Sequence, residues 1–349
     1  MIDTKICNWL MDSADAPIRY RVARELLKDE KIVKSIENEL FNNPEVIKGL
    51  NGLNQDNFDN AVHKCLQLGL HIGIKPLADA LESYVNKFKN YKNKPIRSSF
   101  FMIVLAGFLG ALEIKDEAAV KHMLEILDEL HEFTKKGIYD IYVNAEERSK
   151  LTGIPTHWKD KKFINPELRN KYGYCFPLIH DIPGLHALYG VHSLETDNKI
   201  NAVIEYISTD EFHNTIEDGY GILVDGNRKY HSMGWSPKYP GWFEDTDYIE
   251  NYNQRSNLNS DRETGILFFA QYISKYPPAR KTKWFNDLLN YLEKYKTENG
   301  TYIFPKELLP EKTGQAVGGH HMSFGENRRN KIWIEIESTF YMQLLQQNV

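Results

Sequence analysis

One arrangement recurs along this chain of 349 residues: a segment that is apolar on nearly all sides, followed by a helix that is apolar on one face. Segment 98–112 is of the first kind, and the helix after it carries Ala119, Met123 and Leu127 on a single stripe. A helix that is apolar all round must be buried on every side, whereas a one-faced helix covers it and turns its back to water. The arrangement predicts an all-α fold with an inner and an outer layer of helices.

The same pairing is repeated elsewhere in the chain. Helix pairs of this kind cannot bury their apolar faces alone, so they have to stack on one another or close into a ring. Short helices are expected over the first 41 residues, and a turn-rich stretch from Pro44 to about Asp59. Strand-like alternation is confined to short pieces, such as 219–224 and 301–304. The other apolar segments are 60–70, 183–190, 263–274 and the closing helix 333–346.

Several short motifs carry a resemblance to a known family. Near the N-terminus the chain reads Asn-Trp-Leu at 8–10, Ala-Pro-Ile-Arg-Tyr-Arg at 16–21 and Glu-Leu-Leu at 25–27. Segment 61–69 reads Ala-Val-His-Lys-Cys-Leu-Gln-Leu-Gly, 298–302 reads Glu-Asn-Gly-Thr-Tyr, and Trp-Ile-Glu opens the last helix at 333–335. These motifs resemble bacterial proteins with squalene-cyclase/prenyltransferase-like repeats. The resemblance implies a single α/α toroid over residues 1–349, with N-terminal helices at 1–45 and a central cavity open at one end.

Three long insertions interrupt the helical pattern, at 137–180, 213–261 and 297–332. They hold 13 of the 22 glycines and 6 of the 12 histidines, and long loops inside a compact domain are often functional. Each insertion follows an outer helix and precedes an inner one. Helix direction alternates in such a ring, so we expect all three insertions at the same end, beside the N-termini of the inner helices. Those N-termini carry unpaired N–H groups and favour anionic or polar ligands.

The middle insertion is rich in aromatic side chains that could contact a ligand. Tyr and Trp offer flat stacking faces with a polar edge. The alternative interpretation is that these rings only hold a long loop against the helices. The candidates are Tyr220, Tyr230, His231, Trp235 and Trp242.

A second group of candidates lies at the starts of the inner helices, where acids, bases and histidines alternate. Such side chains suit general acid–base catalysis or the binding of a polar ligand, although first-turn acids and N-caps are also common without any function. We assign His180, Asp181, His186 and Glu263 as candidate catalytic residues. The remaining candidates for ligand binding are His63 (beside Asp59), Arg97, Arg262, His321 (in a Gly-Gly-His-His turn), Trp333 and Glu335.

The sequence predicts no cofactor, and zinc is kept as an alternative. Cys175, His180 and His186 are suitable zinc ligands, and the resembled protein prenyltransferases use an Asp/Cys/His zinc site. Their spacing matches no dense metal-binding motif. The Asp-x-Asp-Asp motif of squalene-type cyclases and the Asp-Asp-x-x-Asp motif that holds magnesium diphosphate do not occur in the sequence. Cyclase or prenyltransferase activity is therefore not expected.

Net charge and hydropathy do not favour nucleic acid or a membrane as a partner. The formal net charge of −5 does not favour a nucleic-acid surface, and no apolar run is long enough to span a bilayer. Three cysteines and the lack of a signal-peptide pattern indicate a cytoplasmic protein. The sequence does not indicate an oligomeric state.

Three hypotheses of function follow from these features. The first is a cytosolic protein that binds a small organic ligand in an aromatic, His-containing central cavity, with acid–base catalysis as an option. The second is a carbohydrate-active toroid enzyme, in which Trp235 and Trp242 would stack on sugars and Asp181 and Glu263 would be the paired carboxylates. The third is a non-catalytic scaffold for a peptide or protein.

Overall fold

The computed structural model describes residues 3–53, 58–89, 96–225, 229–240, 265–309 and 323–347, without the side chains of 59 and 96–100. Contacts between Cα atoms divide the chain into two compact units. Unit 1 consists of Met1–Glu82 and Pro240–Val349, and unit 2 is Ser83–Tyr239. The single toroid domain expected from the sequence stays a prediction.

The protein is mostly helical, as the sequence predicts. Helices hold about 61% of the described residues, which places the fold in the all-α class. The strands in the described part of the chain are short and form two antiparallel hairpins, β1 (Arg169–Asn170) with β2 (Gly173–Tyr174) and β3 (Gly221–Val224) with β4 (Tyr230–Met233). No helix within the described ranges is both long and apolar enough to cross a membrane.

The N-terminal part of unit 1 is a series of short capped helices. The stretch expected to be rich in turns after Pro44 is instead largely helical, which corrects the sequence prediction. Asn43 accepts a hydrogen bond from the Glu45 amide, Pro44 occupies the first turn, and Val46 and Gly49 are buried, so a helix begins where only turns were expected. The elements are α1 (Thr4–Ser13), α2 (Ala16–Arg21), the π-helical turn η1 (Val22–Leu27), α3 (Glu30–Phe41) and α4 (Pro44–Gly52).

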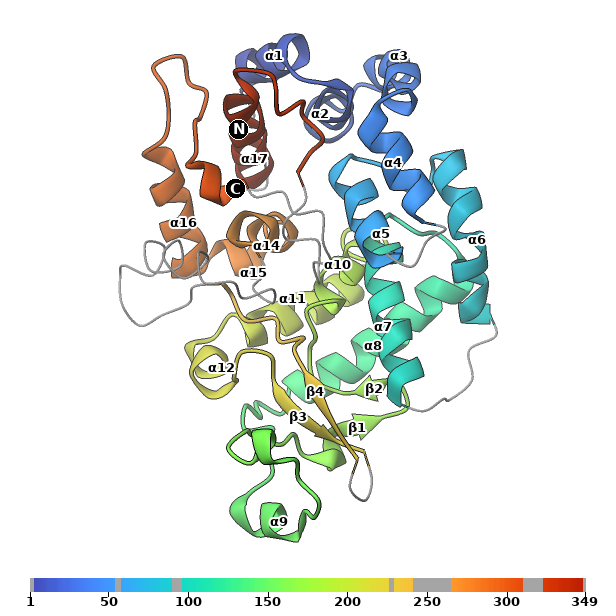
Figure 1. The fold of residues 1–349 in the computed structure, drawn as a ribbon, viewed down its shortest axis with the longest axis vertical. Coiled ribbons are helices and arrows are strands. Elements are labelled where there is room, and N and C mark those ends of the chain that lie inside the picture. The colour runs from blue at the N-terminus through green and yellow to red at the C-terminus, as the bar shows by residue number, and fades with distance from the viewer. Residues whose placement is uncertain are drawn as a thin grey trace. The chain divides into compact units, whose positions relative to one another are not determined.

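The rest of unit 1 supplies two helices that are buried on nearly all sides, α14 and α17. Helix α17 packs against α1, η1 and α14 (Figure 1), and nearly every residue from Ile336 to Leu345 is buried. The one-faced helix α16 buries Trp284, Phe285, Leu288 and Leu292. These burial patterns agree with the expected inner and outer helices. The elements are α5 (Phe58–Gln67), α6 (Lys75–Lys89, which continues into unit 2), α14 (Ile266–Ile273), α15 (Pro277–Arg280), α16 (Lys283–Glu293), η5 (Lys306–Leu308) and α17 (Trp333–Gln346).

Segment 301–304, expected to be strand-like, lies along α17. The Tyr302 amide donates to the Thr339 hydroxyl and the Phe304 amide to the Ser338 hydroxyl, each at 2.9 Å. On its other side the segment pairs with 295–297 through an isolated antiparallel bridge between Lys296 and Tyr302.

Unit 2 is built on the apolar helix α7. It packs against α10, and α11 packs against α8. The inner helix expected at 183–190 is a short α10 followed by a single 3-10 turn. The elements are α7 (Ile96–Ala111), α8 (Glu117–Thr134), α9 (Ala145–Lys150), η2 (Thr156–Trp158), η3 (Pro166–Leu168), α10 (Asp181–Gly184), η4 (Leu185–Ala187), α11 (Leu194–Ile207) and α12 (Asp210–Thr215).

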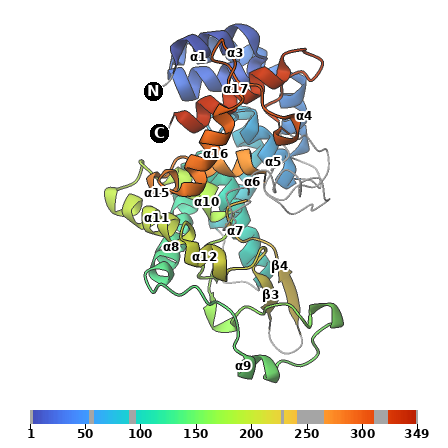
Figure 2. The same ribbon diagram turned by 90° about the vertical axis from the view of Figure 1, so that its left-hand side faces the viewer.

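The first two insertions pack on each other within unit 2. The Ile164 amide donates to the Ile222 carbonyl at 2.8 Å, and the Ile222 amide donates to the Lys162 carbonyl at 2.9 Å. Phe163, Ile222 and Val224 form a small buried cluster there, and the hairpin β3–β4 lies beside the segment that carries α9 (Figure 2). These two insertions are thus in direct contact. The third insertion belongs to unit 1, and its convergence with them stays a prediction.

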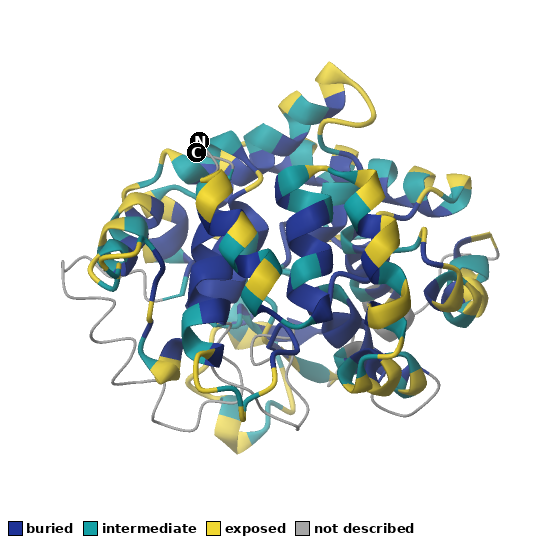
Figure 3. Ribbon diagram, turned by 90° about the horizontal axis from the view of Figure 1, so that it is seen from above, coloured by how far each residue is buried: buried dark blue, intermediate teal, exposed yellow. Residues whose placement is uncertain are grey.

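Burial follows the amphipathic pattern of the helices. In Figure 3 individual helices carry exposed residues on one side and buried residues on the other. Helix α8 is an example, since it buries Ala119, Met123, Leu127 and Leu130 along the stripe that the sequence predicts.

Candidate functional site

His180 lies at the N-terminal end of α10, enclosed by aromatic rings. Its ring meets Phe108 edge-on at 6.0 Å between centroids and Trp235 at 5.7 Å, and the residue is 5% exposed. No side chain in the described ranges forms a hydrogen bond with its ring nitrogens. Burial lowers the pKa of His180 to about 4, so the imidazole is neutral at pH 7.

The neighbouring Asp181 is a buried carboxyl group, and no cation of the described residues contributes to its pKa. It is 8% exposed, and one carboxyl oxygen accepts a hydrogen bond from the Leu178 amide at 2.7 Å. Burial raises the pKa of Asp181 to about 7, although the bond from Leu178 acts in the opposite direction. This carboxyl group therefore changes its protonation state close to neutral pH.

Two backbone contacts fix the positions of His180 and Asp181. Gly107 of α7 has no room for a side chain, because a Cβ atom there would overlap the carbonyl oxygen of His180. On the other side the Ile179 amide donates to the Trp235 carbonyl at 2.8 Å, which ties the end of the first insertion to the second. Trp235 itself is partly exposed.

Tyr220 lies close to Asp181 and has an unusual backbone. Its φ is 59°, in the left-handed region that a bulky side chain rarely adopts. The hydroxyl donates to the Pro177 carbonyl, and the ring packs on Phe176 with centroids 4.7 Å apart. Burial raises the pKa of this tyrosine well above its ordinary value, and the charge of Asp181 contributes in the same direction. Of the sequence candidates, His180, Asp181, Trp235 and Tyr220 are therefore brought together; we call these four residues the His180 site.

The remaining candidates of unit 2 lie elsewhere. The Tyr230 hydroxyl donates to the Thr152 carbonyl at 2.8 Å, and its ring packs edge-on against Phe163, so it belongs to the contact between the insertions. His231 is one-third exposed and lies 3.7 Å from a carboxyl oxygen of Asp225.

The zinc alternative finds no support from geometry. His186 lies in η4 and is partly exposed. Cys175 is partly buried, and burial raises the pKa of its thiol, which disfavours the thiolate that zinc binds. Within the described ranges no three His, Cys, Asp or Glu side chains are grouped so as to hold a metal ion.

Three candidates fall in unit 1 and have structural contacts there. His63 of α5 is buried and packs against Phe268 at 5.8 Å between ring centroids. The Glu335 carboxylate accepts from the Thr301 hydroxyl at 2.5 Å. The guanidinium of Arg328 lies 3.8 Å from the ring centroid of Trp333.

Other candidates lie outside the described residues and are not placed. They are Trp242, Arg262, Glu263 and His321, together with the side chains of Asp59 and Arg97.

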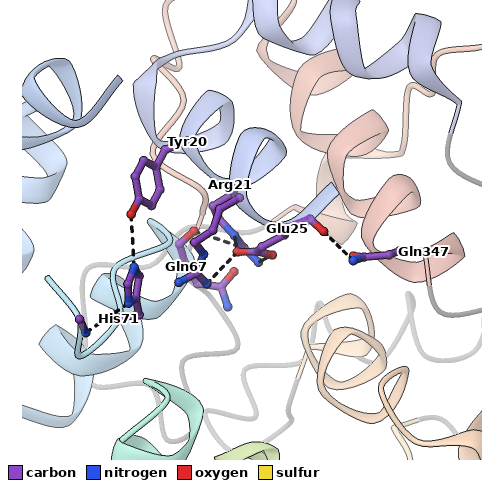
Figure 4. Close-up of polar contacts among 8 residues, drawn as sticks. Tyr20, Arg21, Glu25, Gln67, His71 and Gln347 are labelled. Carbon is purple, nitrogen blue, oxygen red and sulfur yellow. Dashed lines mark hydrogen bonds and ion pairs between the residues drawn. The ribbon is translucent and has the colours of Figure 1, made fainter. Parts of the chain in front are cut away.

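Unit 1 contains a polar cluster that the search for candidates in the sequence did not select. The Arg21 guanidinium makes two bonds of 2.9 Å to the Glu25 carboxylate and one of 3.1 Å to the Gln67 carbonyl (Figure 4). It also lies about 5 Å from the ring centroids of Phe324 and Phe340. The one local signal was the spacing of four residues between Arg21 and Glu25, which places them on one face of a helix.

Glu25 itself stays ionised in this cluster. Burial acts to raise its pKa, but the charge and hydrogen bonds of Arg21 outweigh burial and hold the pKa at about 2. Because the donors of Arg21 are already used within the protein, we assign this cluster a structural role.

Comparison with protein-family models, with curated proteins and with solved structures finds no match to this chain.

Proposed function

We propose that unit 2 binds a small, uncharged organic molecule at the His180 site. The observation that carries this proposal is the buried His180 ring, which lies between two aromatic rings while no described side chain hydrogen-bonds it. The ring nitrogens of His180 are not among the fully enclosed, unpartnered polar atoms of the described residues. A molecule that reaches the site can therefore donate to or accept from the imidazole.

The ligand is expected to be uncharged where it meets His180. The pKa values of both His180 and Asp181 are shifted chiefly by burial and not by a neighbouring charge. A charged ligand group that faces the neutral imidazole would lose its hydration without gaining an opposite charge from His180. Trp235, a partly exposed residue, supplies an aromatic ring beside His180 at the same place.

The site is suited to an acid–base step on the bound molecule. Asp181, with a pKa of about 7, can donate a proton in its protonated form or accept one when ionised. The neutral imidazole of His180 can donate from one nitrogen and accept at the other. In this proposal Asp181 transfers the proton and His180 orients the reacting group.

Histidine-selective NMR tests the binding. Two uncharged probes are added to protein with labelled histidines: 2-naphthol, which presents an aromatic face and one hydroxyl, and glucose, which represents carbohydrate ligands. We expect 2-naphthol to shift the His180 signals, identified by their loss in His180→Gln, while those of the exposed His157 stay unchanged. The matched variant His157→Gln should bind the probe as the wild type does. A shift of His180 with glucose alone would favour the carbohydrate-active alternative, and no shift with either probe would count against the proposal.

We also propose that the helix pairs belong to an α/α toroid of a cytoplasmic protein. The all-round burial of α14 and α17 and the one-faced burial of α8 and α16 support the inner and outer layers. The three free cysteines support a reducing compartment. In a toroid the three insertions share one end, so chemical cross-links are expected between Lys159 or Lys161 of the first insertion and Lys306 of the third. Their absence, with cross-links inside each unit present, would contradict the ring.

A further inference from the structure

The carboxyl groups of Asp15 and Glu326, both in unit 1, take part in two hydrogen bonds that join the start of α2 to the segment around Glu326. The Asp15 amide donates to one carboxyl oxygen of Glu326 at 2.6 Å, and the Asn327 amide donates to the Asp15 carboxylate at 2.8 Å. Asp15 is the N-cap of α2, yet its side chain caps no amide of its own helix. These two bonds join positions more than 300 residues apart in sequence, so they fasten the segment 323–330 to the start of α2.

Glu326 is enclosed in this contact. The residue is 4% exposed, and its second carboxyl oxygen is buried without a hydrogen-bond partner in the described part of the chain. Gly325, with φ at 87°, allows the close approach, since a Cβ atom there would overlap Leu68 and touch Pro17. The Lys64 ammonium holds the neighbouring Ser323 hydroxyl at 3.2 Å.

The charges around Glu326 do not compensate an ionised carboxylate. The charges of Asp15 and Glu337 act against ionisation of Glu326, and the charge of Arg19 in α2 opposes them. Glu337 is itself 1% exposed and pairs with Arg328 at 3.4 Å, and Lys64 pairs with Glu45 of α4 at 3.3 Å. Both of these cations are thus engaged with other carboxylates.

We propose that Glu326 and Asp15 form a pH-sensitive latch, which holds segment 323–330 on α2 while Glu326 is protonated and releases it when Glu326 ionises. An ionised Glu326 would place a negative charge beside Asp15 and Glu337 in a buried position, and release returns that charge to water.

The pKa of Glu326 is shifted in the direction that the latch requires. Burial raises the pKa of Glu326 from 4.5 to about 8; the bond from the Asp15 amide and the charge of Arg19 oppose the rise, and the charges of Asp15 and Glu337 add to it. In the released segment the same carboxyl group is hydrated and has its ordinary pKa. Between these two values the latched form binds one proton more than the released form. Each rise of one pH unit therefore increases the released fraction about tenfold, and the increase ends above pH of about 8.

Hydrogen exchange across pH tests the latch on the full chain. Peptides that cover 13–19 and 323–330 are followed by mass spectrometry from pH 5 to pH 9, and rates are corrected for intrinsic exchange. In the wild type, protection is expected to fall about tenfold per pH unit up to about pH 8 and then to level off. In Glu326→Gln, which keeps a neutral acceptor for the Asp15 amide, protection should not depend on pH. An equal slope in both proteins would overturn the proposal.

Two further variants keep the test decisive. Glu307→Gln removes an exposed acid from the same unit and should leave the wild-type profile unchanged. Asp15→Asn keeps an acceptor for the Asn327 amide but removes a negative neighbour, so the levelling-off point should move to lower pH. If Glu326→Gln fails to fold, the Asp15→Asn profile decides: an unmoved levelling-off point would overturn the latch.

Discussion

Gly110 of α7 and Gly184 of α10 meet backbone against backbone, with no room for a side chain between them. A Cβ atom on Gly110 would overlap the Gly184 carbonyl group, and one on Gly184 would lie 3.2 Å from the Cα atom of Gly107. This contact sets how closely α10 approaches α7. Since His180 and Asp181 lie at the start of α10, the glycines also set the position of the His180 site.

Gly110→Ala is expected to lower the free energy of unfolding by about 1–3 kcal/mol, because the added methyl group forces two backbones apart. The lower melting temperature should be accompanied by a change in the NMR signals of His180. Gly234→Ala is the matched control, because a Cβ atom there meets nothing within 4 Å. If Gly110→Ala and Gly234→Ala have the same melting temperature, the close approach of α7 and α10 does not contribute to stability.

Arg21→Met is expected to cost about 3–5 kcal/mol in urea unfolding, because it leaves the carboxylate of Glu25 without its partner in a largely buried place. The pKa of Glu25 is lowered to about 2, so the pair stabilises the fold fully above pH 4.5 and loses this contribution as the pH falls towards 2. That acid-dependent loss should disappear in Arg21→Met. Arg24→Met, which removes a longer and partly exposed contact at 3.4 Å, should cost less than about 1 kcal/mol.

The two acid–base residues of the His180 site should affect stability with opposite dependence on pH. The pKa of Asp181 is raised from 3.8 to about 7, so its contribution weakens as the pH rises between these values. The pKa of His180 is lowered from 6.5 to about 4, so its contribution weakens as the pH falls between them.

Variants separate these two effects. The unfolding free energy of Asp181→Asn relative to wild type should increase with pH by up to about 1.4 kcal/mol per unit, and that of His180→Gln should increase as the pH falls. Urea unfolding at pH 4, 5, 6 and 7 measures both differences. Two differences that change in the same direction would show that one of these groups is not buried as described.

Trp235→Ala should raise the pKa of His180 towards 6.5, by about one unit or more, because removing the indole lets water reach the imidazole. An NMR titration of the histidine ring signals gives this value. Trp158→Ala, which changes a ring that packs in the cluster around Phe163, serves as the control and should leave the pKa unchanged.

The sequence predicts those parts of the fold that depend on local periodicity. The largely apolar segments 98–112 and 333–346 correspond to α7 and α17 within two residues at each end, because a helix that is buried on nearly all sides carries mostly apolar side chains. Helix α4 was not predicted, since its start depends on Asn43 and Pro44 and few of its residues are buried. Near Gly184 the prediction of a longer helix did not hold, because α10 is shaped by its glycine contact with α7, which has no local signal.

The four residues of the His180 site were all candidates from the sequence, but a local pattern places only Asp181. Asp181 does lie in the first turn of a helix, as an acid at that position suggests. The enclosure of His180 by Phe108 and Trp235 depends on three segments far apart in sequence, so no spacing encodes it. The same holds for Glu326, whose partner Asp15 lies 311 residues away.

The packing of α17 against α1 and η1 has a consequence for synthesis of the chain. Unit 1 is built from the first 82 residues and from those after 239, so unit 2 leaves the ribosome complete while unit 1 still lacks α14 to α17. At ordinary translation rates, α1 and η1 wait on the order of tens of seconds for the helix that covers them. During that interval Leu10 and Val22, both fully buried in the finished protein, have no native partner in α17. A nascent chain of this protein therefore presents its N-terminal helices to chaperones for longer than its central unit.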